Sequence, residues 1–192
     1  NAILFEEKSA LTAIFAVCSG VFKLCKTNDD GSENIVGLRF PGELIGEDAL
    51  FLKTYNYTAI AIGDSSVCAV RVDQMTSCGQ LVPELQQNLI NLLNKQSYLH
   101  HVTTQAYIGK KSAESLLAAF LLNIVDRNAA HSGSDSQINL MISRHDIANF
   151  LGLRRETLSR LLTRFQKEHL IFMEGKLISL LAKDNLKKLA NI

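Results

Sequence analysis

Segment 142–166 carries the residues whose types and spacing are best suited to chemistry, because five arginines lie among regularly spaced apolar side chains. An apolar residue recurs every three or four positions, which predicts an amphipathic helix with one side buried. This apolar stripe is formed by Leu158, Leu161, Leu162 and Phe165. The opposite side is cationic and rich in hydrogen-bonding groups, so its expected ligand is a polyanion.

The side chains on that opposite face are of the kinds that read DNA bases. Arginine can bond guanine O6 and N7 in bidentate fashion, and glutamate can accept from cytosine N4. A recognition helix presents such residues from its N-terminal turns to base edges in the major groove. The predicted base-reading residues are Arg155, Glu156, Ser159 and Arg160.

The surrounding sequence predicts a winged helix-turn-helix. Ser143 can cap a first helix over 144–150 with Asp146 as its reciprocal partner, and Gly152 suits the sharp turn that follows. A second helix begins near Arg155, and a hairpin comes after it. Residues beside the reading face are better placed for phosphates, which position a protein without specifying sequence. The predicted phosphate contacts are Ser143, Arg144, Thr157 and Arg164.

Residues 1–80 have the pattern of an antiparallel barrel or sandwich. Short runs rich in β-branched and aromatic residues alternate with turn signals about every ten residues. Turns are expected at Ser19-Gly20, around Gly31, at Pro41-Gly42 and at Gly63-Asp64. Gly31 can take the positive φ that a hairpin tip requires.

The pattern changes to helix from Pro83 to about Ile108, and proline fits a first helical turn. A helix of this length is often shared with a partner chain, and two stripes compete for that role. The apolar stripe contains Leu85, Leu89, Leu92 and Leu99. The polar stripe contains Asn91, Asn94, Tyr98, His101 and Gln105. Either stripe could face a second subunit, and the sequence leaves the choice open.

A second core is expected around a helix that begins near Ser112, a plausible N-cap. Its apolar residues surround most of the helix, which is typical of a central position. A polar loop is expected over 128–137, a hairpin turn at Glu174-Gly175 and a terminal helix over 183–190.

Charge divides the chain into two parts with different partners. The net charge is +1, but residues 110–192 hold 13 Lys and Arg against 8 Asp and Glu, whereas residues 1–109 hold 7 against 11. The basic part favours a polyanion. No apolar run reaches the roughly 18 residues of a membrane span. The start at Asn1, with no signal-peptide pattern, suggests a fragment.

The four cysteines, Cys18, Cys25, Cys68 and Cys78, have neither a CxxC pair nor metal-ligand spacing. We expect them to be buried small hydrophobic residues in a reducing cytosol. A disulfide framework is not expected, because the chain is long enough to build its own core.

The segment RHDIANFLGLRRETLSRLLTRFQKEHLI resembles the DNA-binding signature of the CRP/FNR family of bacterial transcription regulators, and is most similar to its FNR branch. The likeness extends over nearly the whole chain, since GSENIVGLRFPGELIGEDAL resembles the family's β-roll. The resemblance implies an α+β fold in three segments. These are an N-terminal antiparallel β-roll of the cyclic-nucleotide-binding type over 1–80, a long dimerisation helix over 81–109 and a C-terminal winged helix-turn-helix over 110–192.

The resemblance also implies partners, because family members bind palindromic DNA as homodimers and contact RNA polymerase. The FNR-type E-x-x-S-R reading motif is present as Glu156, Ser159 and Arg160, and Arg155 adds a feature typical of the CRP branch. The resemblance therefore implies a TTGAT-like or TGTGA-like half-site without choosing between them. The dimer helix would contribute Leu92, Tyr98, Leu99, His101 and Gln105. The hairpin tip that FNR-type activators present to polymerase matches Thr27, Asp30, Gly31 and Ser32.

Three models describe the signal that such a protein would sense. Cyclic AMP is disfavoured, because Gly46-Glu47 match the family's ribose contacts but Tyr57 stands where arginine would bind the phosphate. FNR proteins bind an oxygen-labile [4Fe-4S] cluster through four thiolates, and Cys68 matches one of them. The segment that bears the other three is absent, so the fragment alone would not bind a cluster. The third model covers haem, another ligand or no effector.

Two other functions are weighed against a regulator that activates. A cupin-like enzyme would need a His/Glu metal cluster or a nucleophile–base pair in the barrel. Residues 1–99 contain no histidine, so we expect no enzyme. A repressor would use the same DNA helix without a polymerase contact. Either regulator is expected in the cytoplasm, with no membrane partner.

The polar stripe predicts a weak dimer. FNR proteins carry apolar residues and a repulsive acidic side chain where this chain has Asn91, Asn94, Tyr98 and His101. A polar seam usually lowers dimer stability. Protonation of His101 would add repulsion, so we hypothesise that dimerisation depends on pH.

Overall fold

The computed structural model describes residues 2–74, 83–109, 112–132 and 136–192. The chain divides into two compact units, Asn1–His100 and His101–Ile192, and mixes strands and helices in an α+β fold as predicted. Within the described residues, no helix is both long enough and apolar enough to cross a lipid bilayer.

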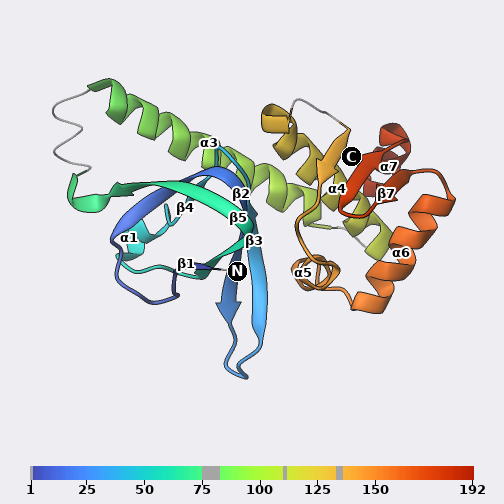
Figure 1. Ribbon diagram of the computed structural model, residues 1–192, viewed down its shortest axis with the longest axis horizontal. Helices are drawn as coiled ribbons and strands as arrows, with labels where there is room; N and C mark the ends of the chain where they lie inside the picture. Colours follow the sequence, from blue (N-terminus) through green and yellow to red (C-terminus); the bar gives the residue numbers. More distant parts are fainter. Residues whose placement is uncertain (1, 75–82, 110–111, 133–135) are drawn as a thin grey trace. The chain divides into compact units, whose positions relative to one another are not determined.

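The first unit is built on a five-stranded antiparallel sheet (Figure 1). The strands pair in the order β1-β5-β2-β3, and β4 pairs with β2. Their bounds are Ile3–Phe5 (β1), Ala13–Thr27 (β2), Glu33–Arg39 (β3), Leu44–Ile45 (β4) and Thr58–Arg71 (β5), and helix α1 is Ala49–Leu52. The sheet encloses an apolar core in which the rings of Phe5 and Tyr55 stack with their centroids 3.7 Å apart. This is the predicted β-roll.

Strands β2 and β5 are each continuous, so the turns predicted at Ser19-Gly20 and Gly63-Asp64 are wrong. Gly20 and Gly63 have φ of +78° and +69°, and the pairing of β2 with β5 shifts register around Ser19. The glycines therefore serve β-bulges that bend the strands without reversing the chain. Only glycine fits at position 20, because an added Cβ would lie 2.2 Å from Ser65 Oγ.

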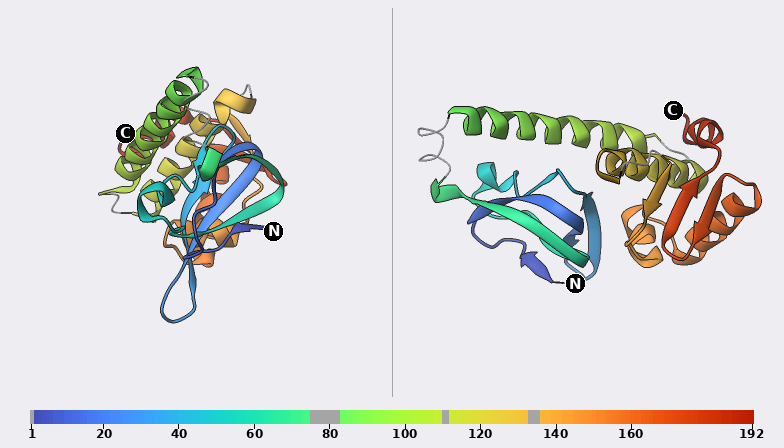
Figure 2. Two further views of the ribbon diagram at one scale, coloured as in Figure 1. Left: turned by 90° about the vertical axis from the view of Figure 1, so that its left-hand side faces the viewer. Right: turned by 45° about the horizontal axis from the view of Figure 1, so that its top comes forward.

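The hairpin between β2 and β3 has the tip that the sequence predicts, and it projects from the sheet (Figure 2). Gly31 has a φ of +79°, and the Asn28 amide donates to Ser32 O at 2.8 Å. Asp30 Oδ1 accepts from the Ser32 amide at 2.9 Å and from its hydroxyl at 2.6 Å. These donors hold the pKa of Asp30 below its ordinary value. The tip is thus exposed but locally ordered.

Helix α3, Pro83–Tyr107, begins at the predicted proline. Gln96 is buried, and its Oε1 accepts from the Leu44 amide at 3.2 Å, so the Gln96 side packs on the β-roll. Leu99 is half-buried, whereas Leu92 is 37% exposed. The polar stripe is exposed at Asn91, Asn94, Tyr98, His101 and Gln105. Described residues of both stripes are thus exposed, and burial leaves the choice between the stripes open.

Helix α4, Ala113–Ser132, is central to the second unit as predicted. The Ser115 amide donates to Ser112 Oγ at 3.1 Å, which is the expected N-cap. The fully buried side chains of α4 include Leu117, Phe120, Leu121 and Ile124. The helix continues past Asn128, where a polar loop was expected to begin, so that start is wrong. The two alanines that follow are strong helix formers and favour this continuation. Part of the expected loop, 133–135, lies outside the described residues.

The remaining elements form the layout expected of a winged helix-turn-helix (Figure 1). The three-stranded sheet has the order β6-β8-β7, and its hairpin turns at Gly175 with a φ of +58°. The bounds are Gln137–Asn139 (β6), Arg144–Phe150 (α5), Arg155–Lys167 (α6), Ile171–Glu174 (β7), Leu177–Leu180 (β8) and Lys183–Ala190 (α7).

The cysteines depart from the expected burial. Cys25 is buried as predicted, but Cys18 and Cys68 are exposed on the outer side of the paired strands β2 and β5. The expectation is therefore wrong for these two, because no described element covers that side of the strand pair. Cys78 lies outside the described residues.

Candidate nucleic-acid interface

Helix α5 is held at both ends by local hydrogen bonds, which fix the turn into α6. Ser143 Oγ accepts from the Asp146 amide at 3.0 Å and donates to Asp146 Oδ2 at 2.7 Å, so the predicted cap forms. At the other end Gly152 has a φ of +65°, and its amide donates to Asn149 O at 3.0 Å. Helix α6 then begins at Arg155.

Helix α6 is anchored by the apolar stripe that its sequence predicts. Leu158, Leu162 and Phe165 are at most 2% exposed, and Leu161 is half-buried. Each fully buried side chain of this size contributes about 1.5–3 kcal/mol. The stripe therefore sets which side of α6 faces outward.

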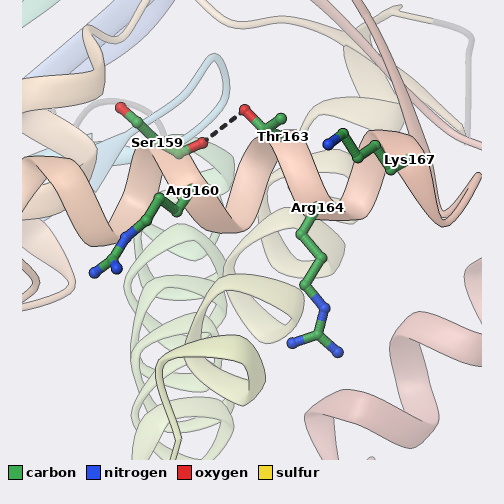
Figure 3. A pocket seen from close by; sticks show the side chains of 5 residues that line it. All are labelled: Ser159, Arg160, Thr163, Arg164 and Lys167. Atoms are coloured by element: carbon green, nitrogen blue, oxygen red, sulfur yellow. Dashed lines mark hydrogen bonds between the residues drawn. The ribbon is translucent and has the colours of Figure 1, made fainter.

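The outward side of α6 carries the predicted base-reading residues. Arg155, Glu156 and Arg160 are exposed, and Ser159 is half-buried. Figure 3 shows Arg160 and Arg164 on one flank of the helix and Ser159, Thr163 and Lys167 on the other. These five side chains line a surface hollow. Such an open cationic groove suits an extended polyanion better than an enclosed small molecule.

Thr163 and Lys167 extend this face beyond the residues selected from the sequence. Thr163 Oγ1 donates to Ser159 O at 3.0 Å, so its hydroxyl is turned back to the helix. Lys167 is exposed one turn further on. Their spacing from Ser159, four and eight positions, predicts their place on the same side of the helix.

Arg164 is engaged within the protein. Its Nε donates to Glu168 Oε1 at 2.6 Å, and its Nη1 contacts Glu114 Oε1 on α4. The bond to Glu168 is the main cause that raises the pKa of Arg164, with Glu114 adding to it. The phosphate contact expected of Arg164 would compete with these two carboxylates.

The other expected phosphate contacts differ in how freely they can reach a ligand. Arg144 is exposed in the first turn of α5, and Thr157 is half-buried. The Ser143 hydroxyl is occupied by the helix cap. Among the four predicted phosphate contacts, Arg144 is therefore the side chain that is best exposed to a ligand.

The residues that match the family's cyclic-nucleotide contacts are engaged by other groups of the protein. The Gly46 amide donates to the buried Tyr57 hydroxyl at 3.0 Å, which uses a backbone donor. Arg39 donates to Glu47 Oε1 at 3.3 Å and lies 2.6 Å from His100 Nε2, which must accept. Burial raises the pKa of Glu47 and of Tyr57. Arg39, the cation that contacts Glu47 among the described residues, is thus already engaged by Glu47 and His100.

Cys68, the residue that matches a cluster ligand, lies beside another thiol. Its Sγ accepts from Cys18 Sγ at 3.1 Å. Among the described residues, no group of three or more His, Cys, Asp or Glu side chains is arranged to hold a metal ion. These residues therefore do not fit a four-thiolate cluster by themselves.

Comparison with known proteins agrees with this geometry. Residues 117–189 match the model of the Crp-like helix-turn-helix domain, and residues 1–80 match that of the cyclic nucleotide-binding domain. The transcriptional activator protein FnrA of Stutzerimonas stutzeri is 33% identical over 97% of this chain and 76% of its own. The transcriptional activator protein anr of Pseudomonas aeruginosa is 34% identical over the same shares. The structure of FixK2 from Bradyrhizobium japonicum superposes with a TM-score of 0.78 and 25% identity, covering 98% of this chain and 92% of that one.

A β-roll followed by a winged helix-turn-helix with an exposed arginine face defines a DNA-binding regulator. The chain belongs to the CRP/FNR family of transcription regulators, as its relatives over most of their length show. Relatives of this kind are named as regulators and activators, not enzymes.

Proposed function

We propose that the chain binds a palindromic promoter site as a homodimer and regulates transcription in the cytoplasm. In this proposal residues 1–80 sense a signal, 81–109 pair two chains and 110–192 bind DNA. The observation that carries it is the anchored helix α6, whose outward side presents Glu156 and Arg160. Such side chains specify bases in the major groove, whereas Arg144 would contact phosphate.

Operator binding tests this proposal. Arg160→Ala should weaken binding to a TTGAT-type or TGTGA-type palindrome by about 5- to 150-fold, because a bidentate base contact contributes about 1–3 kcal/mol. Glu156→Ala should relax the preference at one base position. Fluorescence anisotropy with operator duplexes of matched and single-substituted sequence measures both effects.

The matched control is Lys187→Ala, which removes an equal charge from exposed α7. It should leave the ratio of specific to non-specific affinity unchanged. If Arg160→Ala and Glu156→Ala both bind the palindrome as the wild type does, α6 is not the reading helix.

The proposed dimer uses the exposed side of α3. Tyr98, His101 and Gln105 lie on this side, while Gln96 holds the opposite side against the β-roll. Leu99 then serves the packing of α3 within its own chain more than the seam. A polar seam of this kind would give a dimer that conditions can shift.

Activation is proposed to use the hairpin tip formed by Thr27, Asp30, Gly31 and Ser32, as a contact for RNA polymerase. The tip is exposed, and Asp30 is held in place by Ser32. Asp30→Ala should lower transcription from a promoter with the operator while DNA binding is unchanged. Asp29→Ala, an adjacent exposed carboxylate, is the control. In vitro transcription measures both, and a wild type that only lowers transcription would be a repressor.

A cluster signal would need thiolates besides those of Cys18 and Cys68. Anaerobic reconstitution of the wild type and Cys68→Ser with iron and sulfide tests this model. Cluster absorbance in the wild type that Cys68→Ser abolishes would support it. Wild type without that absorbance would leave haem or another effector as the alternative.

A further inference from the structure

Two exposed thiols lie together on the outer side of the β-roll. Cys18 of β2 and Cys68 of β5 are 50 positions apart, and their Sγ atoms are 3.1 Å apart. A disulfide bond is about 2.05 Å long, so the sulfurs need to approach by only about 1 Å. Both thiols are free, and both are open to solutes.

The β-bulge in β2 creates this pair. In the antiparallel register Val17 faces Val67 and Ser19 faces Ser66. Strand β2 therefore has one additional residue, Cys18, between two pairs that are adjacent on β5. A bulge lets consecutive residues share one face of a strand. Cys18 and Ser19 are accordingly both exposed, and Ser19 Oγ lies 2.7 Å from Ser66 Oγ. The outer face thus holds a serine pair next to a cysteine pair.

We propose that Cys18 and Cys68 form a reversible dithiol–disulfide site that hydroperoxides oxidise. Disulfides in reducing compartments are mainly transient or redox-sensing, so an exposed, aligned pair is the kind that oxidants would convert. The two residues also have different roles. Cys18 donates its S–H to Cys68, which leaves the Cys68 sulfur as the nucleophile. Cys18 is then the resolving thiol, which reacts in the second step.

The chemistry is balanced with the hydroperoxide as the only oxidant. The Cys68 thiolate attacks the terminal oxygen, an S–O bond forms and the O–O bond breaks, which yields Cys68 sulfenic acid and an alkoxide that is protonated to an alcohol. Cys18 sulfur then attacks Cys68 sulfur and expels hydroxide, which takes the Cys18 proton and leaves as water. The two thiols lose two electrons in total, and the hydroperoxide is reduced to alcohol and water.

This site does not depend on DNA binding, but it uses Cys68, the same residue that matches a cluster ligand, so a disulfide and a cluster are alternative states of Cys68. The described residues add no third metal-ligating side chain to the pair. A bond between Cys18 and Cys68 would join β2 to β5 across the bulge and close a loop of the chain. Its expected result is a β-roll locked in one register.

Peptide mapping of the full chain under non-reducing conditions tests the proposal. Wild type treated with hydrogen peroxide should lose two free thiols, yield one cross-linked peptide pair containing Cys18 and Cys68, and recover both thiols with dithiothreitol. Cys25→Ala is the control and should give the same cross-link, since Cys25 is buried. In Cys18→Ser, dimedone should trap Cys68 as sulfenic acid.

Rates distinguish the two roles. Cys68→Ser should react with peroxide more slowly than Cys18→Ser, because the proposal assigns the attacking sulfur to Cys68. A wild type that keeps its thiols, or that joins Cys68 to Cys78, overturns the site. Equal rates in the two variants overturn the assignment of Cys68 as nucleophile. The wild-type map needs no substitution, so the site remains testable even if a variant misfolds.

Discussion

Arg39 is a buried cation of the β-roll that contacts several polar groups. Its guanidinium donates to Leu44 O at 2.9 Å and to Glu47 Oε1 at 3.3 Å, and it lies 2.6 Å from His100 Nε2. Glu47 Oε2 and Asp48 Oδ1 are buried without a hydrogen-bond partner among the described residues. Unpaired buried oxygens disfavour the charged carboxylate. The cluster thus connects α3 to the sheet while keeping Glu47 in an unfavourable environment.

The stability of the β-roll should therefore depend on pH through Glu47. Burial raises its pKa, and Arg39 offsets only part of that rise. A carboxyl whose pKa is raised by folding stabilises the fold fully below its ordinary pKa, and this contribution is lost as the pH rises through the raised value. We expect the wild type to lose stability relative to Glu47→Gln as the pH rises from about 4 to 7. Denaturation of both proteins across this range measures the difference, and a constant difference would contradict the prediction.

Among the elements, the bulged strand β2 depends most on one residue. Gly20 combines a φ of +78° with a neighbour that an added Cβ would meet at 2.2 Å. Gly31 has nearly the same φ, +79°, but nothing within 4 Å of that position. Comparing substitutions at these two glycines therefore separates the cost of backbone strain from the cost of steric overlap.

Alanine at these two positions should have unequal effects. Gly31→Ala introduces only left-handed strain, about 1–2 kcal/mol. Gly20→Ala adds overpacking of about 1–3 kcal/mol, because the Ser65 side chain and Asp64 O must shift. Thermal unfolding followed by circular dichroism should show a larger loss of Tm for Gly20→Ala. Equal losses would mean that the bulge relaxes without cost.

At the scale of the whole molecule, the distribution of charge and the proposed homodimer would together set the affinity for DNA. The basic excess of residues 110–192 favours DNA, and the acidic excess of residues 1–109 limits non-specific attachment. In the proposed homodimer two reading helices would bind one operator, so operator affinity would depend on how strongly two α3 helices pair. A polar seam would make that pairing weak.

Dimerisation should weaken at low pH if His101 lies in the seam. Histidine as a residue type changes charge near neutral pH, and like charges that face each other across a seam repel. Sedimentation velocity should show more monomer at pH 6, and His101→Gln should remove that difference. His145→Gln, an exposed histidine on α5, should retain it. Identical dimerisation of the wild type at both pH values rules the hypothesis out.

The local sequence pattern was sufficient to predict helices α5 and α6 of the DNA-binding unit. The spacing of Leu158, Leu162 and Phe165 predicts the buried side of α6, and the capping by Ser143 predicts the start of α5. The bases that α6 reads remain a prediction. These features depend on neighbours within a few positions, so the chain itself carries the information.

Only the tertiary structure decided features that join distant positions. The glycines at 20 and 63 look like turn signals until the pairing of β2 with β5 shows them to be bulges, and the partner of Cys18 follows from that same register. The side of α3 that packs on the β-roll was decided by the contact between Gln96 and Leu44. Strand register and packing partners are set by the free energy of the whole core, and no local spacing encodes them.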